Sequence, residues 1–159
     1  MSREILFKAK GKDNGEWAEG YFFDDGMVNP EHYFVGDLVI EEYKGTACDE
    51  WDITGIGFVE VDPSTLCQYT GKRDKNGNRI FEGDILDGFS YPYCYDGKHN
   101  YYAEVCWFEE VCAFGLYTVK YPNANVCGIS EGSTELMENW DLQNWEVIGN
   151  IFDNKVGEK

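Results

Sequence analysis

The chain has 159 residues, 43% of them apolar and 16% aromatic, which is enough to bury a core without disulfide bonds. The 30 acidic and 13 basic residues give a formal net charge of −17, and a field of that sign repels DNA, RNA and anionic lipid. We therefore exclude a large catalytic barrel and expect no direct nucleic-acid binding and no membrane partner. The length predicts one domain over residues 1–159, which could be divided into an N-terminal β-module (1–68) and a C-terminal small-barrel module (69–153).

The N-terminal segment and the cysteines indicate the cellular compartment. Arg3 and Glu4 place charges where a secretory signal peptide would need an apolar segment, so we expect none. No apolar run approaches the ~18 residues of a membrane-spanning helix. We expect a soluble cytoplasmic protein with its 6 cysteines reduced. Because no cysteine pair has C-x-x-C spacing, we expect no zinc site and no cofactor.

The first part of the chain predicts short strands joined by tight turns. We expect strands over residues 5–10, 16–23, 33–43 and 56–61. Asn14-Gly15 separates the first two, and Asn-Gly supplies the positive φ angles of a hairpin turn. Asp62-Pro63 then predicts a single helical turn, because aspartate caps a helix start and proline favours its first position.

The rest of the chain predicts a second hairpin and further antiparallel strands. We expect strands over residues 79–86, 102–108, 114–121 and 145–152. Asn76-Gly77 forms the turn of the second hairpin, and residues 134–139 are expected to form a short helix. In the last strand, period-2 alternation places Trp145, Val147 and Ile151 on one face.

These patterns together define the fold class. Short runs between glycine turns, aromatic and β-branched enrichment and the lack of helical periodicity are typical of antiparallel β proteins. We predict a mainly β fold with one or two short helical turns, whose hairpins curl into a small barrel or sandwich. Two β-subdomains that share a core are the alternative arrangement.

One long block carries a family resemblance. Residues 59–85, which include DPSTLCQYTG and DKNGNRIFEGDI, resemble the central block of the YopX-like phage and prophage proteins. Residues 5–20 and 145–152 look like that family's two ends, whereas residues 45–55 and 87–101 look like insertions. The resemblance implies a small, β-rich accessory protein that is encoded on mobile DNA and located in the cytoplasm of a host bacterial cell. It implies no catalytic residues, because the family has no established activity to transfer.

Two short segments resemble known functional motifs, one catalytic and one calcium-binding, but each lacks an essential residue. Residues 128–132 match the G-x-S-x-G nucleophile elbow of hydrolases, yet no histidine follows Ser130. Residues 74–78 imitate the first half of a calcium-binding loop, but Arg79 replaces the required glycine and Ile85 replaces the closing glutamate. We interpret both motifs as turns and expect no catalytic residue and no metal site.

Two features are candidates for a binding surface. Basic residues surround both hairpins (Lys8, Lys10 and Lys12 at the first), and if the tips lie together they form a positive spot for phosphate or an acidic protein patch. Tyrosines two residues apart would share one face of an extended strand and offer a recognition surface. The candidate binding residues are Lys72, Arg73, Lys75, Asn76, Arg79, Tyr91, Tyr93 and Tyr95. The alternatives are a solvated hairpin tip and a packed aromatic core.

These observations favour a non-enzymatic phage or prophage accessory protein that acts by protein–protein interaction and homo-oligomerisation, with itself and a host or phage protein as partners. The alternative is an acidic nucleic-acid mimic that inhibits a host DNA-binding enzyme, which the net charge of −17 favours. A mimic should concentrate its carboxylates in a track that matches duplex charge spacing, whereas here they are spread along the chain. An enzymatic function, which would need a pocket, is the third hypothesis.

Overall fold

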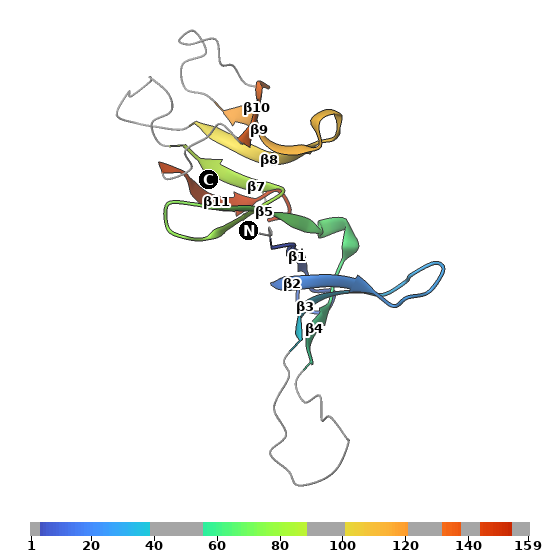
Figure 1. Cartoon of the computed structure of the whole chain (residues 1–159). Coiled ribbons are helices and arrows are strands. Elements are labelled where there is room, and N and C mark those ends of the chain that lie inside the picture. Colours follow the sequence, from blue (N-terminus) through green and yellow to red (C-terminus); the bar gives the residue numbers. More distant parts are fainter. Residues whose placement is uncertain (1–3, 39–55, 89–100, 121–131, 138–143, 154–159) are drawn as a thin grey trace. The chain divides into compact units, whose positions relative to one another are not determined.

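The computed structural model describes residues 4–38, 56–88, 101–120, 132–137 and 144–153. The chain forms two compact units, an N-terminal unit of residues 5–68 and a C-terminal unit of residues 1–4 and 69–159. Antiparallel strands build both units, and within the described ranges the helical elements are single 3-10 turns (Figure 1). The fold is therefore mainly β, as the sequence predicts.

The N-terminal unit is a sheet of hairpins in the order β4-β3-β2-β1-β5. Its strands are β1 (Phe7–Lys10), β2 (Trp17–Asp24), β3 (Tyr33–Leu38), β4 (Ile56–Glu60) and the beginning of β5 (Cys67–Arg73). The predicted Asn14-Gly15 turn joins β1 to β2 and sets a register in which Lys10 pairs with Trp17. The strand expected over residues 33–43 is described as far as Leu38, and its remainder lies outside the described residues.

The single helical turn predicted after β4 is present as η1 (Pro63–Thr65). Asp62 caps it by accepting a hydrogen bond from the Ser64 N–H at 2.9 Å. Because proline lacks an N–H, Pro63 leaves no donor unsatisfied at the start of the turn. The sequence signal was sufficient here because every contact it needs is local.

The core of the N-terminal unit determines which way β2 faces. Ala9, Val35 and Val61 are fully buried, and Ala18 and Phe22 of β2 pack against them. Successive side chains of a strand point to opposite faces. The odd-numbered residues of β2 therefore point away from this core.

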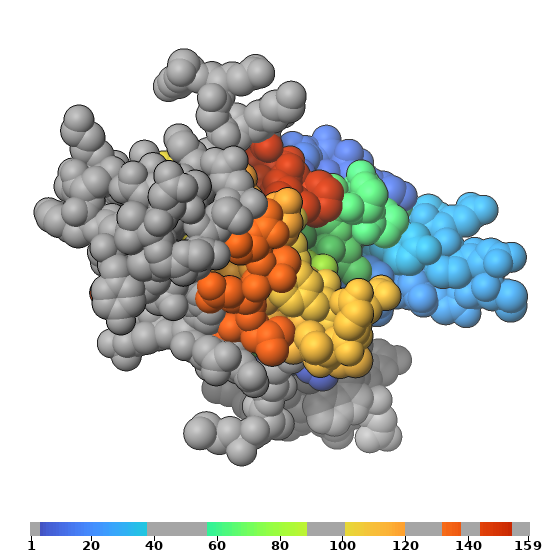
Figure 2. Space-filling model, turned by 90° about the horizontal axis from the view of Figure 1, so that it is seen from above, coloured from blue at the N-terminus to red at the C-terminus, as the bar shows by residue number. Residues whose placement is uncertain are grey.

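The C-terminal unit contains a five-stranded antiparallel sheet in the order β10-β9-β8-β7-β11. The strands that follow β5 are β6 (Arg79–Phe81), β7 (Asp84–Asp87), β8 (Tyr102–Phe108), β9 (Ala113–Lys120), β10 (Thr134–Leu136) and β11 (Glu146–Asn150). β5 pairs with β6, and the 3-10 turn η2 (Glu109–Val111) joins β8 to β9. Figure 2 shows β8–β9 in yellow and β10 in orange as neighbours on one surface.

Aromatic and aliphatic side chains fill the core of the C-terminal unit. Trp145 packs edge-on against Tyr101 with their ring centroids 5.2 Å apart. The buried core residues are Ile80, Leu86, Tyr101, Ala103, Val105, Phe114, Leu116, Met137 and Trp145. Five of these nine residues lie on β7, β8 and β9, so this sheet supplies most of its own hydrophobic face.

Two sequence expectations for this unit are wrong. The short helix expected over residues 134–139 begins instead as strand β10, in which Glu135 pairs with Leu116 of β9; residues 138 and 139 lie outside the described residues. The pairing with β9 satisfies backbone groups that a short helix would have to satisfy within itself.

The second correction concerns the faces of the last strand. A bulge between Val147 and Gly149 shifts the register of β11 against β7. An extra residue reverses the alternation beyond it, so Ile151 is 47% exposed and Asn150 is buried. Trp145 and Val147 do face the core as expected.

Candidate functional site

Asp74 is a buried carboxylate at the turn between β5 and β6. It accepts hydrogen bonds from Asn76 N (2.8 Å), Asn78 N (2.8 Å), Asn78 Nδ2 (3.1 Å) and Val147 N (3.2 Å). Burial acts to raise its pKa, but the N–H donors of Val147, Asn78 and Asn76 outweigh burial and hold the pKa of Asp74 below its ordinary value. The carboxylate thus fixes the turn and ties it to β11.

Asp84 is a second buried carboxylate, and Asn150 is its buried partner. Asp84 accepts hydrogen bonds from Phe81 N at 2.8 Å and Asn150 Nδ2 at 3.0 Å. The Asn150 side chain also donates to the Glu82 carbonyl at 3.3 Å and accepts from Phe152 N at 3.0 Å. This pair holds the Glu82-Gly83 turn against the end of β11.

These contacts give the central block of the sequence an architectural role. The carboxylates of Asp74 and Asp84 both face N–H donors of the chain itself. An oxygen that faces N–H donors is not available to a cation in the same place. The geometry therefore agrees with the interpretation of residues 74–78 as a hairpin turn.

The candidate residues Lys75 and Asn76 lie together, and both contact Glu146 of β11. The Lys75 Nζ lies 2.6 Å from Glu146 Oε2, and Asn76 Nδ2 donates to Glu146 Oε1 at 3.2 Å. The hydrogen bond between Lys75 and Glu146 raises the pKa of Lys75 and lowers the pKa of Glu146. The positive charge at this tip is therefore largely compensated within the unit.

The arginines of the second hairpin also have local partners. Arg73 Nη1 donates to the Gly77 carbonyl at 2.7 Å. The Arg79 guanidinium lies 5.9 Å from the Tyr69 ring centroid and 3.8 Å from a Glu4 carboxylate oxygen. Lys72 is half-buried beside them on β5.

The remaining candidate residues fall outside this description. Tyr91, Tyr93, Tyr95 and Ser130 lie outside the described residues. Lys8, Lys10 and Lys12 belong to the N-terminal unit, whereas Lys72 to Arg79 belong to the C-terminal unit. A joint positive spot and a tyrosine surface therefore stay predictions.

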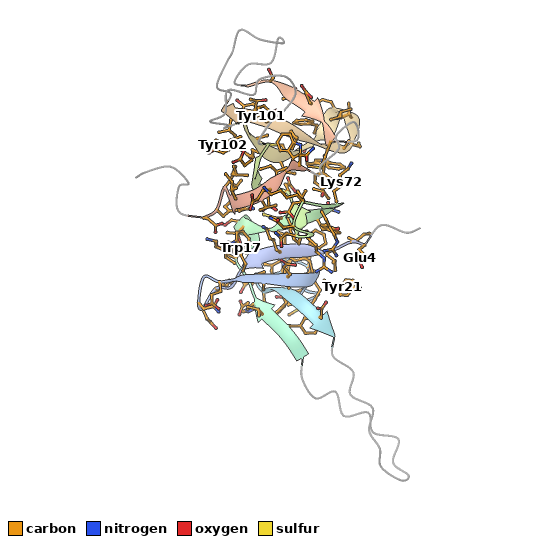
Figure 3. The ribbon with its side chains drawn as sticks, turned by 90° about the vertical axis from the view of Figure 1, so that its left-hand side faces the viewer. Glu4, Trp17, Tyr21, Lys72, Tyr101 and Tyr102 are labelled. Atoms are coloured by element: carbon orange, nitrogen blue, oxygen red, sulfur yellow. The ribbon has the colours of Figure 1, made fainter. Side chains whose placement is uncertain are left out.

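The side of β2 that points away from the core is a different candidate for a binding surface. Lys8 and Lys10 of β1 place their Nζ atoms 4.8 and 5.2 Å from the centroid of one Trp17 ring. Further along β2, Tyr21 is 60% exposed and Phe23 is 38% exposed. Glu19 lies opposite Lys8 in the strand register and is exposed on the same side. We call these six residues the outer face of β2; Figure 3 labels Trp17 and Tyr21.

Aromatic side chains of the neighbouring strands pack beside the exposed Phe23 on the same face of the sheet. Its ring meets Phe58 of β4 edge-on, with centroids 4.5 Å apart, and stacks on Phe34 of β3 at 5.3 Å. Three neighbouring strands thus hold Phe23 in place. The outer face of β2 is a rigid aromatic surface as a result.

The β2–β3 loop, residues 25–32, continues this surface beyond the strand. The Asp25 carboxylate accepts hydrogen bonds from Met27 N (3.0 Å), Glu31 N (3.1 Å) and His32 N (3.2 Å). These N–H groups, that of Met27 most strongly, hold the pKa of Asp25 below its ordinary value, so the loop keeps its negative charge. At the loop's tip Met27 is 70% and Val28 98% exposed.

Two further reactive side chains are Cys106, in the C-terminal unit, and His32, at the end of the β2–β3 loop. The half-buried thiol of Cys106 on β8 has its pKa raised to about 12, first by burial and then by the Glu104 carboxylate. His32 Nδ1 lies 2.9 Å from Glu60 Oε1, which also accepts a hydrogen bond from Lys12 Nζ at 2.7 Å. A half-buried thiol beside a carboxylate and a histidine–glutamate contact both occur in residues that have only a structural role.

Sequence reasoning placed a strand over β2 but missed its outer face. The available signal was that residues 17, 21 and 23 are aromatic while residues 18 and 22 are apolar as well. A strand that is apolar on both faces either is buried on both or presents one face to a partner. The core residues of the unit contact only the even-numbered side.

The fold and this surface define a small, mainly β protein with an aromatic face turned outward. The family model described as YopX protein matches residues 7–156, and the chain belongs to the YopX family. None of the curated proteins matches it significantly. The chain is similar to the crystal structure of protein EF1440 from Enterococcus faecalis, with 22% identity over 94% of each chain and a TM-score of 0.47. In the described parts of the chain, no helix has the length and hydropathy to cross a bilayer.

Proposed function

We propose that the protein is a non-enzymatic accessory factor of a phage or prophage, which acts in the host cytoplasm by binding proteins, its own copies included. The observation that carries this proposal is the outer face of β2, where Tyr21 and Phe23 are exposed and two lysines lie over the half-buried Trp17. Aromatic residues are enriched at the centres of protein interfaces. The phage or prophage setting rests on the family resemblance of the sequence.

The buried carboxylates support the non-enzymatic part of the proposal. A general acid or base must reach a substrate proton. The carboxylate oxygens of Asp74 and Asp84 instead accept hydrogen bonds from N–H groups of their own turns and of β11. Their burial therefore serves folding.

The proposal also includes the curvature of the sheet in the N-terminal unit. The bridge between Gly11 and Val61 joins the end of β1 to the end of β4, although β2 and β3 lie between them in the sheet. Such a contact requires a strongly curled sheet. We favour a small barrel for the N-terminal unit on this ground.

The acidic nucleic-acid mimic is the second candidate, supported by the net charge of −17. A mimic binds its target enzyme through carboxylates, so its binding should be lost at high salt and should not depend on aromatic residues. Capture of a host DNA-binding enzyme that high salt releases, equally by wild type and by Tyr21→Ser, would favour this second candidate.

The substitution Tyr21→Ser tests the first candidate. Tyr21 is 60% exposed and contributes little to the core, so the variant should fold while it loses aromatic contact area. We expect its self-association, measured by sedimentation velocity, to weaken by about tenfold or more, the usual cost of an aromatic interface residue.

Tyr117→Ser is the matched control, because Tyr117 is a strand tyrosine of β9 that is 42% exposed. It should sediment like the wild type. Equal association of the wild type and both variants would show that copies of the protein do not bind through the outer face of β2. A wild type that stays monomeric at every concentration would contradict self-association itself.

A further inference from the structure

The chain contains two Asn-Gly turns, which hold the asparagine side chain in different ways. Asn14-Gly15 joins β1 to β2, and Asn76-Gly77 lies between β5 and β6. Both asparagines are exposed. An asparagine amide is most open to attack by the next backbone nitrogen when glycine follows, because glycine has no Cβ to obstruct the approach. Each turn is therefore a place where the chain can modify itself.

The first turn folds the amide of Asn14 over the peptide bond to Gly15. Asn14 Oδ1 accepts a hydrogen bond from Glu16 N at 3.0 Å. An asparagine that accepts from the N–H two residues further on closes an Asx turn around the intervening peptide. The side-chain carbonyl thus lies beside Gly15 N. The Glu16 N–H polarises this carbonyl and faces the oxygen on which negative charge develops during attack.

In the second turn the equivalent N–H has another partner. The donor two residues after Asn76 is Asn78 N, which donates to the buried Asp74 carboxylate at 2.8 Å. The Asn76 amide instead donates to Glu146 Oε1 of strand β11 at 3.2 Å, and Lys75 Nζ holds the same carboxylate at 2.6 Å. Before it can react, the Asn76 side chain has to leave Glu146 and fold back over its own turn.

The other contacts of the two turns do not account for a difference between them. Each glycine N–H donates to a backbone carbonyl of its own turn, at 2.9 Å for Gly15 and 3.0 Å for Gly77. The Asn14 amide also donates to Glu16 Oε2 at 3.2 Å. Because Glu16 belongs to the same turn, this bond does not draw the amide away from Gly15, whereas Glu146 holds its amide from a distant strand.

We propose that Asn14 is a site of spontaneous deamidation through a cyclic imide, and that the fold protects Asn76. Deprotonated Gly15 N attacks Asn14 Cγ, and the new N–C bond closes the ring. The bond from Cγ to Nδ2 breaks, and the amide takes up the proton that Gly15 N lost and leaves as ammonia. Water then opens the ring at either carbonyl, which leaves aspartate or isoaspartate at residue 14. This inference does not depend on the proposed function.

The modification changes the charge and the backbone of the β1–β2 turn. Asp13 and Glu16 flank Asn14 and are exposed, so a further carboxylate concentrates negative charge there. Isoaspartate also routes the backbone through the side chain, which removes the acceptor of the Glu16 N–H and opens the Asx turn. The protein thus acquires a second, more acidic form as it ages.

Incubation of the folded full chain at neutral pH, followed by digestion at acid pH and mass spectrometry, tests the proposal. The deamidated fraction at each asparagine is followed over time, and electron-transfer fragmentation distinguishes isoaspartate from aspartate. We expect Asn14 to react at least about tenfold faster than Asn76, because the hydrogen bond to a charged group that Asn76 has to break is sufficient for that factor. Isoaspartate should form at residue 14, since direct hydrolysis of the amide gives aspartate alone.

Two carboxylate variants are matched, because each removes one acceptor that lies 3.2 Å from an asparagine Nδ2. Glu146→Ala should raise the rate at Asn76 several-fold and leave the rate at Asn14 unchanged. Glu16→Ala keeps the backbone N–H that Asn14 Oδ1 accepts, so Asn14 should remain the faster site. Thermal unfolding establishes that both variants are folded. An unchanged rate at Asn76 in folded Glu146→Ala would contradict the protection by Glu146.

The wild type in urea is the reference that needs no variant. With neither turn held, Asn14 and Asn76 should react at similar rates. A ratio in urea as large as in the folded chain would mean that the local sequence sets the rates, and the proposal would then be wrong. Equal rates in the folded chain, a faster Asn76, or deamidation of Asn14 without isoaspartate would overturn it as well.

Discussion

Asp74 shows how a single side chain can determine the shape of a hairpin. It is 6% exposed and accepts four hydrogen bonds, three from its own turn and one from β11. The hydrogen bond from β11 comes from Val147, which is far from Asp74 in the sequence. The burial of Asp74, rather than of another aspartate in this acidic sequence, depends on this contact. The sequence therefore predicted the turn but not the burial of its carboxylate.

The substitution Asp74→Asn should reveal this role. The amide has one oxygen where the carboxylate has two, so at least one buried N–H loses its acceptor. We expect the free energy of unfolding to fall by about 1–3 kcal/mol in urea denaturation at neutral pH. Asp13→Asn, an exposed aspartate in the other hairpin, is the control and should stay within about 0.5 kcal/mol of the wild type.

The same variant has a defined pH dependence. Because folding lowers the pKa of Asp74, its contribution is present above the pKa of the unfolded chain, about 3.9, and is lost as the pH falls through the lower folded value. The stability gap between wild type and Asp74→Asn should therefore narrow below about pH 4. A gap that stays constant from neutral to acid pH would show that the charge of Asp74 contributes nothing.

At the scale of the element, turns with local signals were predicted and long-range pairings were not. Asn14-Gly15 and the Asp62-Pro63 cap carry their contacts within a few residues. By contrast, strand β10 exists because it pairs with β9, and the β11 bulge exists because of its register against β7. Neither partner is visible in the local sequence, so a helix and a regular alternation were expected there.

Gly83 offers a test of the turn that Asp84 and Asn150 support. Its φ of +74° is one that other residues adopt at a cost, and an added Cβ would lie 3.1 Å from Ile151 Cγ1. Gly77, with φ +83°, has no atom within 4 Å of such a Cβ. Alanine substitutions at the two glycines therefore distinguish the cost of backbone strain from the added cost of side-chain crowding.

We expect Gly77→Ala to lower the free energy of unfolding by about 1–2 kcal/mol, the cost of the left-handed conformation. Gly83→Ala should lower it by a further 1–3 kcal/mol or so, because the added methyl also displaces Ile151 or Asn150. Urea denaturation of both variants gives the comparison. An equal decrease in the free energy of unfolding in both variants would mean that the turn accommodates a Cβ at residue 83 without crowding.

For the whole molecule, the sequence indicated a mainly β protein of the YopX family, and both hold. It favoured Lys72–Arg79 and the tyrosine-rich segment as the binding surface. The structure gives most of those cations partners within the C-terminal unit and exposes a face of β2 instead. Exposure depends on which face of a strand the core occupies, and a sequence that is apolar on both faces does not specify this.

Hydroxyl-radical footprinting of the wild-type chain tests the central claim, that the outer face of β2 is where copies of the protein meet. Met27, Tyr21 and Tyr117 are all exposed in a single copy and carry side chains that the radical oxidises. Between dilute and concentrated protein, the oxidation rates of Met27 and Tyr21 should fall several-fold while that of Tyr117 stays constant. Unchanged rates at Met27 and Tyr21 in a concentrated sample that sediments as a dimer would contradict the account.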